Sequence, residues 1–325
     1  MKLSIHTERW PTRTPFRIAG RVFDAFESVV VQLEQGASVG QGEALGVFYL
    51  GDTPERLVAQ IEALRPALAG GIDRNQLQAM LPPGGARNAL DAALWDLDAK
   101  SSGRSIWALS GVEPKSLETV FTIGIEASAD EMAAKAAAAR HCPLLKVKLD
   151  GTAPVERMQA IRLARPDARI VVDANQGWSF EQLEAVAPAM AELGVQMIEQ
   201  PLARNQDAPL ENYRSPVPLF ADESCLHRGE LAQAALRYQG INIKLDKAGG
   251  LTHALELAHA ARALGMGVMV GCMGGSSLAM APSFVAGCLA DLVDIDGPLL
   301  QASDRLPGLR YQGCQVEVFG QDVWG

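Results

Sequence analysis

Two lysines stand two positions apart in the stretch LLKVKLD, which otherwise has the apolar composition of a buried strand. Because side chains alternate between the two faces of a strand, Lys146 and Lys148 share one face, and the apolar residues beside them share the other. Burying two ammonium groups side by side costs free energy, so we expect this pair to serve a function. Such closeness lowers the basicity of one lysine, which could then act as a base near neutral pH.

Four more charged residues end short apolar runs farther along the chain. Counting from Lys148, the successive intervals to Asp173, Glu199, Asp222 and Lys244 are 25, 26, 23 and 22 residues. Each interval is one strand–helix unit, so we expect all five side chains at one mouth of a barrel. Any one of the acids could instead cap the helix that follows it. Their shared register favours three oxygen ligands for one Mg²⁺ ion.

The elements that must position these groups are eight apolar runs that alternate with alanine-rich amphipathic segments. This order predicts an α/β fold, a (β/α) barrel of the modified TIM type, over residues 119–300. Residues 1–118 have strand and helix patterns of a different order and predict an α+β capping domain. Residues 301–325 leave the repeat, and we expect them to return to the cap. The eight runs begin at residues 119, 144, 169, 195, 219, 240, 267 and 291.

The positions of two lysines in the barrel indicate a reaction. Lys148 ends the second strand and Lys244 ends the sixth, so the two would face each other across the metal. A base on each side of a carbon next to a carboxylate can remove a proton from one face and return it on the other. This is racemisation or epimerisation, and Mg²⁺ would stabilise the enediolate. Lys247 has the opposite parity and is the weaker candidate for an acid or base.

Five motifs in order, KVKLD, VVDANQGW, MIEQPL, ADESC and NIKLDKAGG, resemble the strand-end motifs of the enolase superfamily, in its muconate-lactonising subgroup. The resemblance runs through essentially the whole chain. It implies that Lys148 and Lys244 are the acid/base pair, and that Lys146 contacts the substrate carboxylate. It also implies one Mg²⁺ per subunit, bound by Asp173, Glu199 and Asp222.

The eighth strand narrows the choice of reaction within this subgroup. In DIDGP, Asp294 and Asp296 share one face at the barrel mouth, where two carboxylates could hold a cation, although they could also end a solvated loop. The pair is similar to that of dipeptide epimerases, which bind the free ammonium group of a dipeptide. We also expect Thr122 and Met273 to contact the substrate.

Further motifs resemble the L-Ala-D/L-Glu epimerases of murein peptide recycling: WPTRTPF, GGARNALDAALWDLDA, LLKVKLD and DIDGP. The expected reaction is therefore Mg²⁺-dependent epimerisation of L-Ala-L-Glu to L-Ala-D-Glu at the C-terminal residue. The alternatives are an N-succinylamino acid racemase, an o-succinylbenzoate synthase or a cycloisomerase of the same subgroup. A protein that only binds anionic ligands would have no use for two opposed lysines.

One segment departs from the pattern of L-Ala-D/L-Glu epimerases, in which a basic residue of the cap loop reads the glutamate side chain. Here that loop is FRIAGRVFDAFES, in which Phe23 and Phe26 occupy the expected tip. Its only positive residues are Arg17 and Arg21. The preferred side chain of the dipeptide is therefore left open.

Composition excludes several other classes of protein. The net charge of -9 argues against nucleic acid or an anionic membrane as partner, and no apolar run has the length of a membrane span. We expect a cytoplasmic enzyme with a small-molecule substrate, and a homo-oligomer remains open. The five cysteines form no CxxC pair, which predicts reduced packing residues. The glycine-rich stretch GQGEALG, residues 40–46, has neither the spacing nor the βαβ context of a phosphate loop.

Overall fold

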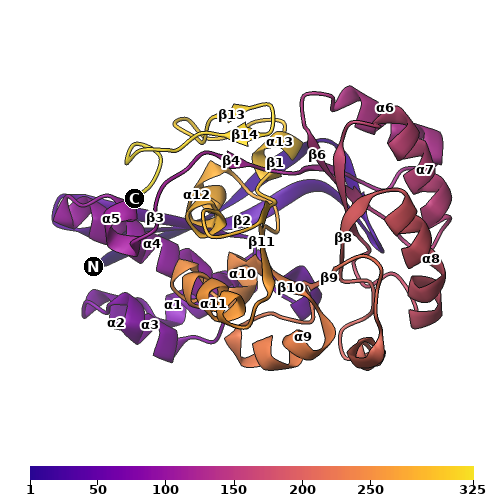
Figure 1. Ribbon diagram of the computed structural model, residues 1–325. Helices are drawn as coiled ribbons and strands as arrows, with labels where there is room; N and C mark the ends of the chain where they lie inside the picture. Colours follow the sequence, from indigo (N-terminus) through magenta and orange to yellow (C-terminus); the bar gives the residue numbers. More distant parts are fainter.

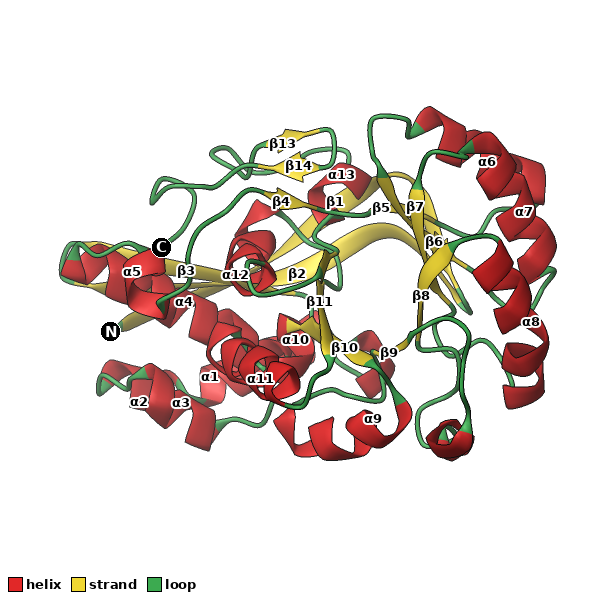
Figure 2. Ribbon diagram, viewed as in Figure 1, coloured by secondary structure: helices red, strands yellow, loops and turns green.

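Eight parallel strands form one curled sheet in chain order, as the repeat of apolar runs predicts (Figures 1 and 2). The computed structural model describes residues 1–325. The Val120 amide donates to the Val293 carbonyl at 2.8 Å, and the Ile295 amide donates to Thr119 Oγ1 at 2.9 Å. These bonds join the first strand to the last, which confirms the predicted barrel. The strands are β5(Phe121–Ile123), β6(Leu144–Lys148), β7(Arg169–Asp173), β8(Val195–Glu199), β9(Leu219–Ala221), β10(Gly240–Lys244), β11(Gly267–Gly271) and β12(Leu292–Val293).

Helices cover the outside of this barrel. Several begin at a serine whose hydroxyl accepts a first-turn amide, as at Ser128, Ser179 and Ser276. Between β8 and β9 the connection contains only the 3₁₀ turn η2(Ala208–Asn212). None of the helices combines the length and the apolar content that a membrane crossing requires. The barrel helices are α6(Ala129–Ala138), α7(Pro154–Ala164), α8(Phe180–Glu192), α9(Leu231–Arg237), α10(Leu245–Ala248), α11(Leu251–Ala263), α12(Ser277–Gly287) and α13(Gly297–Leu300), with the 3₁₀ turn η3(Arg228–Glu230) before α9.

The barrel interior is built in layers. The lower layer is apolar and consists of Val120, Leu144, Val171, Met197, Phe220 and Met269. A Cβ at Gly240 or Gly267 would lie 2.4 or 2.5 Å from the Phe220 ring, so both positions require glycine for that ring to fit. Two residues farther along the strands, the same alternation turns polar side chains into the barrel. Lys146, Asp173, Glu199 and Asp222 lie in this upper layer, and Lys148 lies two positions beyond Lys146 on the same face of its strand. Lys244 lies likewise two positions beyond Asn242.

The N-terminal residues form a three-stranded antiparallel sheet packed on helices. Its strands are β1(Lys2–Ile18), β2(Arg21–Gln35) and β3(Ser38–Ala44), in that order. In Figure 2 the long β1–β2 hairpin extends from the cap helices to the barrel strands. A short turn after β3, η1(Phe48–Leu50), lies near the barrel mouth. The helices are α1(Pro54–Ala63), α2(Arg65–Ala69), α3(Arg74–Met80), α4(Gly85–Ser102) and α5(Ile106–Ser110).

The glycine-rich stretch 40–46 serves close packing. A Cβ at Gly40 would lie 2.1 Å from the Ala93 carbonyl oxygen of α4, and one at Gly42 would lie 2.1 Å from that of Ala89. Because these glycines lack side chains, β3 lies directly on the backbone of α4. The glycines of this stretch are therefore explained by packing, in agreement with its exclusion as a phosphate loop.

The last residues pack on the cap. Two short strands, β13(Tyr311–Gln312) and β14(Gln315–Val316), form a small antiparallel sheet with β4(Leu117–Glu118). The Trp324 indole N–H donates to the Gln41 carbonyl at 3.0 Å, and the Gly325 amide donates to Asp96 Oδ1 at 2.7 Å. The C-terminal segment thus joins the barrel to the cap sheet.

One sequence-based expectation is wrong here. Cys142 and Cys314 form a disulfide with a Cα–Cα distance of 5.1 Å, whereas all five cysteines were expected to be reduced. Cys142 precedes β6 and Cys314 lies in the turn between β13 and β14, 172 residues away. Their approach depends on where the C-terminal segment packs, which the spacing of cysteines does not reveal. Cys225, Cys272 and Cys288 are free thiols, as expected.

We predict that Gly42→Ala lowers the free energy of unfolding by about 3 kcal/mol, because the new methyl group must push β3 away from α4. Urea denaturation followed by circular dichroism measures this loss. Ser38→Ala in the same strand is the matched control and should change the stability by less than about 0.5 kcal/mol. A Gly42→Ala protein as stable as the parent would contradict the close packing of strand on helix.

Candidate active site

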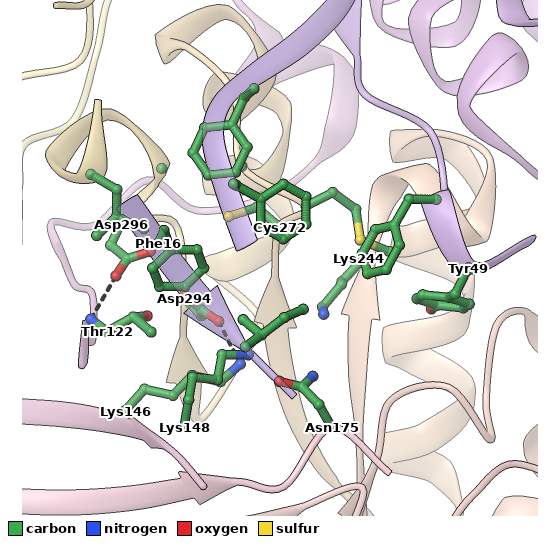
Figure 3. A pocket seen from close by; sticks show the side chains of 18 of the residues that line it. Phe16, Tyr49, Thr122, Lys146, Lys148, Asn175, Lys244, Cys272, Asp294 and Asp296 are labelled. Atoms are coloured by element: carbon green, nitrogen blue, oxygen red, sulfur yellow. Dashed lines mark hydrogen bonds and ion pairs between the residues drawn. The ribbon is translucent and has the colours of Figure 1, made fainter. Parts of the chain in front are cut away.

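A pocket lies at the carboxyl ends of the barrel strands, beneath the cap (Figure 3). Seven of the ten residues predicted for the site line it, and the other three, the acids Asp173, Glu199 and Asp222, are fully buried at the ends of neighbouring strands. Register explains the convergence, because Lys148 pairs with Asp173 across β6 and β7, and Asp173 pairs with Glu199 across β7 and β8. The seven lining residues are Thr122, Lys146, Lys148, Lys244, Met273, Asp294 and Asp296.

Lys146 is the centre of an ion-pair cluster. Its Nζ lies 2.7 Å from Glu199 Oε2, 2.7 Å from Asp294 Oδ2 and 3.1 Å from Asp173 Oδ2. Lys148 Nζ donates to Asp173 Oδ2 at 2.6 Å. The two lysines of β6 are thus tolerated in the interior because three carboxylates surround them.

A second cluster surrounds Asp222. Lys244 Nζ donates to Asp222 Oδ2 at 2.6 Å, and Lys247 Nζ donates to Asp222 Oδ1 at 2.5 Å. Lys247 also donates to the Asn242 carbonyl at 2.8 Å, and it does not line the pocket. Its ammonium group is therefore held outside the pocket lining, in keeping with its place as the weaker candidate for an acid or base.

These surroundings lower the pKa of Asp173 and Asp222 and raise that of Glu199. Burial alone would raise the pKa of Asp173, but Lys148 and Lys146 outweigh it and hold the pKa at about 2. The pKa of Asp222 is lowered further, since Lys244 and Lys247 outweigh the effect of burial. In contrast, burial and the charge of Asp173 raise the pKa of Glu199.

Carboxylates raise the pKa of two lysines of the pocket, Lys146 and Lys244. Burial lowers the pKa of Lys146, but Asp294, Glu199 and Asp173 outweigh it, so that the pKa is raised. The pKa of Lys244 is raised for the same reason, chiefly by Asp222 and Glu199. Carboxylates therefore decide the basicity of these lysines more than lysine–lysine repulsion does, and a bound cation would reduce their effect.

The acids fit a divalent cation. Asp173, Glu199 and Asp222 offer only hard oxygen atoms from three neighbouring strands, the chemistry that Mg²⁺ prefers. Glu199 Oε2 is fully buried and receives no hydrogen bond, although Lys146 Nζ lies 2.7 Å away. Only Glu199 Oε1 accepts one, from Asn242 Nδ2 at 2.6 Å. A buried carboxylate oxygen that shares its one ammonium partner with two other acids is suited to a metal ion.

At the other side of the pocket two acids form an anionic end. Asp296 Oδ2 accepts the Thr122 amide at 2.7 Å, and ligand atoms of Cys272, Asp294 and Asp296 lie within 4.8 Å of one another. Burial and then Asp294 raise the pKa of Asp296 to about 7. Figure 3 shows this end separated from Lys244 by the width of the pocket. A cationic group of a substrate would be stabilised here.

Sequence reasoning missed several polar residues of the site. Asn242 lies two positions before Lys244 on the same face of its strand, a spacing that could have revealed it. Asn175 and Glu223 line the pocket just beyond predicted metal ligands. Tyr49 enters from the cap, and only the docking of cap on barrel places it there.

Together these groups can move a proton across a substrate carbon. Lys148 and Lys244 reach the same pocket from β6 and β10 (Figure 3). The pocket therefore has a lysine on each of two sides, buried acids that fit a cation and an anionic end that fits a positive group. Aromatic side chains of the cap line its top.

Comparison with known proteins identifies the family of the chain. The model of the mandelate racemase / muconate lactonizing enzyme N-terminal domain matches residues 1–111, and that of the enolase C-terminal domain-like family matches residues 128–297. The chain is 43% identical to an L-Ala-D/L-Glu epimerase of Escherichia coli over 95% of this chain and 97% of that protein. It is 42% identical to an N-acetyl-D-glutamate racemase of a Pseudoalteromonas species over 78% and 80% of the two chains.

Solved structures agree. An enolase family member of Agrobacterium tumefaciens with homology to dipeptide epimerases, solved with sodium and L-Ala-L-Glu, is 41% identical, with a TM-score of 0.97 over 99% of both chains. A dipeptide epimerase of Cytophaga hutchinsonii, complexed with Mg and D-Ala-L-Val, is 26% identical, with a TM-score of 0.91 over 97% of this chain and 92% of that one. With both domain models matched and close relatives along its whole length, the chain belongs to the enolase superfamily, in the mandelate racemase / muconate lactonizing enzyme family.

Proposed function

We propose that this protein is a Mg²⁺-dependent dipeptide epimerase that interconverts L-Ala-L-Glu and L-Ala-D-Glu at the α-carbon of the C-terminal residue. The observation that carries the proposal is the placement of Lys148 and Lys244 in one pocket, above three buried carboxylates. The names of the relatives from Escherichia coli and Agrobacterium tumefaciens support the substrate.

In this mechanism the two lysines act on opposite faces of the α-carbon. For one epimer, Lys148 Nζ accepts the α-proton and Lys244 Nζ donates a proton to the other face; for the other epimer the roles reverse. Asp173, Glu199 and Asp222 would hold Mg²⁺, which supplies positive charge beside the substrate carboxylate. Lys146 lies among the same acids, where its ammonium group can contact that carboxylate.

Substrate orientation follows from the anionic end of the pocket. Asp294 and Asp296 bind the ammonium group of the dipeptide, while Thr122 fixes Asp296 through its backbone amide. Because Asp296 has a pKa raised to about 7, the arrival of a positive charge favours its ionised form. Met273 contributes an apolar surface to the same pocket.

A second candidate substrate is an N-acylated amino acid. The relative from Pseudoalteromonas is named as a racemase of N-acetyl-D-glutamate. This compound differs from a dipeptide because it has no ammonium group. The raised pKa of Asp296 would also allow this group to donate a hydrogen bond to an acyl oxygen. The dipeptide remains the first candidate because two adjacent acids are best satisfied by a cation.

The cellular setting is part of the proposal. We propose a cytoplasmic enzyme of murein peptide recycling that can form a homo-oligomer. The resemblance of its motifs to the epimerases of that process supports the pathway, and the net charge of -9 is in keeping with a small-molecule enzyme.

We predict that Asp173→Ala, Glu199→Ala and Asp222→Ala each abolish turnover of L-Ala-L-Glu, because each removes one ligand of Mg²⁺. Mg²⁺ titration by calorimetry should show binding to the parent and none to these variants. Asp130→Ala, an exposed acid on α6, is the control and should bind Mg²⁺ like the parent. Parent-like binding together with turnover in any of the three variants would make the ligand assignment wrong.

The two lysines should be separable by stereochemistry. Lys148→Ala should stop α-proton exchange from one epimer and leave some exchange from the other, whereas Lys244→Ala should do the reverse. Proton NMR in D₂O, with each epimer supplied separately, measures both rates. Equal exchange of the two epimers in either variant would contradict a base on each face.

The third prediction concerns Asp296→Asn. For L-Ala-L-Glu we expect kcat/KM to fall roughly 30- to 1000-fold, because a cation is left poorly paired in a buried site. For N-acetyl-L-glutamate the same change should have little effect, since this compound presents no cation. A parent enzyme that prefers the acetylated compound, or a variant that loses both activities equally, would favour the N-acylamino acid racemase instead.

A further inference from the structure

The cap covers the pocket with a wall that carries no charge. Five apolar residues line the cap side, and Phe23 packs against Phe26 and Phe48 with ring centroids 5.7 and 5.6 Å apart. Tyr49 contributes the single hydroxyl on this side and packs edge-on against Phe48 at 5.2 Å. The five apolar residues are Phe16, Ile18, Phe23, Phe26 and Phe48.

The two arginines of the cap loop lie outside this wall. The Arg21 guanidinium stacks 4.8 Å from the centroid of Phe23 and 4.4 Å from that of Phe48, and it lines a neighbouring outer cavity. Arg17 is half exposed and lies 3.8 Å from Glu126. Neither lines the pocket, so no cation of the cap is placed to bind a side-chain carboxylate there.

The Tyr49 hydroxyl is buried and has no hydrogen-bond partner in the protein. Leaving such a group unpaired costs about 1 to 3 kcal/mol. Burial and then the charges of Asp222 and Glu223 raise its pKa, so the phenol keeps its proton and can donate it. The nearby Arg204 guanidinium cannot substitute for it, because it is bound to the Glu223 carbonyl and to Glu230.

The loop that carries Tyr49 is fixed to the barrel beside one of the lysines. Asp246 Oδ1 accepts the backbone amides of Leu45 at 3.1 Å and Gly46 at 2.8 Å. Asp246 is two residues beyond Lys244 in the chain. The position of Tyr49 relative to the reacting carbon is therefore set by a short and rigid connection.

We propose that Tyr49 determines substrate specificity by donating a hydrogen bond to the terminal oxygen of the C-terminal side chain, whose methylene groups pack on the phenylalanine wall. The inference rests on the proposed epimerase function and names the substrate class. Since the wall lacks a cation, the site recognises a hydrogen-bond acceptor, not a charge. Dipeptides ending in glutamine should therefore be used at least as well as those ending in glutamate.

The test compares three substrates of similar length, L-Ala-L-Glu, L-Ala-L-Gln and L-Ala-L-Met, by α-proton exchange in D₂O with Mg²⁺. For the parent we expect kcat/KM for the glutamine dipeptide to equal or exceed that for the glutamate dipeptide. Tyr49→Phe should lower kcat/KM roughly tenfold for the glutamate and the glutamine dipeptides, because each loses one hydrogen bond. The kcat/KM for the methionine dipeptide should stay the same or rise. Arg21→Met is the matched control and should leave the ratios among the three substrates unchanged.

Two outcomes would overturn the role of Tyr49. An equal loss for all three substrates in Tyr49→Phe would show that the hydroxyl only supports the fold, which a thermal melt would register. A selective loss of the glutamate dipeptide in Arg21→Met would show that an arginine reads the charge. A parent that exchanges no dipeptide but acts on N-acetyl-L-glutamate would instead refute the proposed substrate, a result that the other two outcomes cannot produce.

Discussion

The balance of buried charge inside the barrel is the constraint on which the rest of the structure depends. Lys146, Lys148, Lys244 and Lys247 are all buried, and each lies within 2.7 Å of a carboxylate oxygen. An ammonium group in such a place is stable only if its partner is held in position, because a lone buried charge costs several kcal/mol. The strand register holds these carboxylate partners in place. The apolar layer lies beneath them and the cap lies over them, so that both limit their exposure to solvent.

The layered interior helps to hold this cluster of charges in a fixed arrangement. Beneath it the ring of Phe220 fills the space left by two glycines, so that the floor of the site is dense and apolar. Above it the phenylalanines of the cap line the pocket with apolar surface. Electrostatic interactions between these layers are stronger than they would be in solvent, which is what a reaction that develops charge on a carboxylate requires.

Much of the barrel and its charged ring could be predicted from the sequence, and the reason is geometric. In a parallel barrel the ends of strands meet at one mouth, so residues such as Asp173 and Glu199 are brought together by the repeat alone. Contacts between distant segments carry no such signal. The bond between Cys142 and Cys314 depends on where the C-terminal segment packs, and the place of Tyr49 depends on how the cap docks. The raised pKa of Lys146 has a related cause, because the acids around this lysine come from three different strand ends.

Asp246 holds the cap loop that precedes Tyr49 through two of its backbone amides. These hydrogen bonds involve only the backbone of the loop and do not depend on its side chains. The residues that face the substrate can therefore change while the loop stays attached to the barrel. The same attachment point could therefore support very different pocket walls while the lysines and acids below stay where they are. In evolutionary terms, the architecture separates the part that performs the reaction from the part that selects the molecule, and new specificities become accessible by single substitutions in the cap.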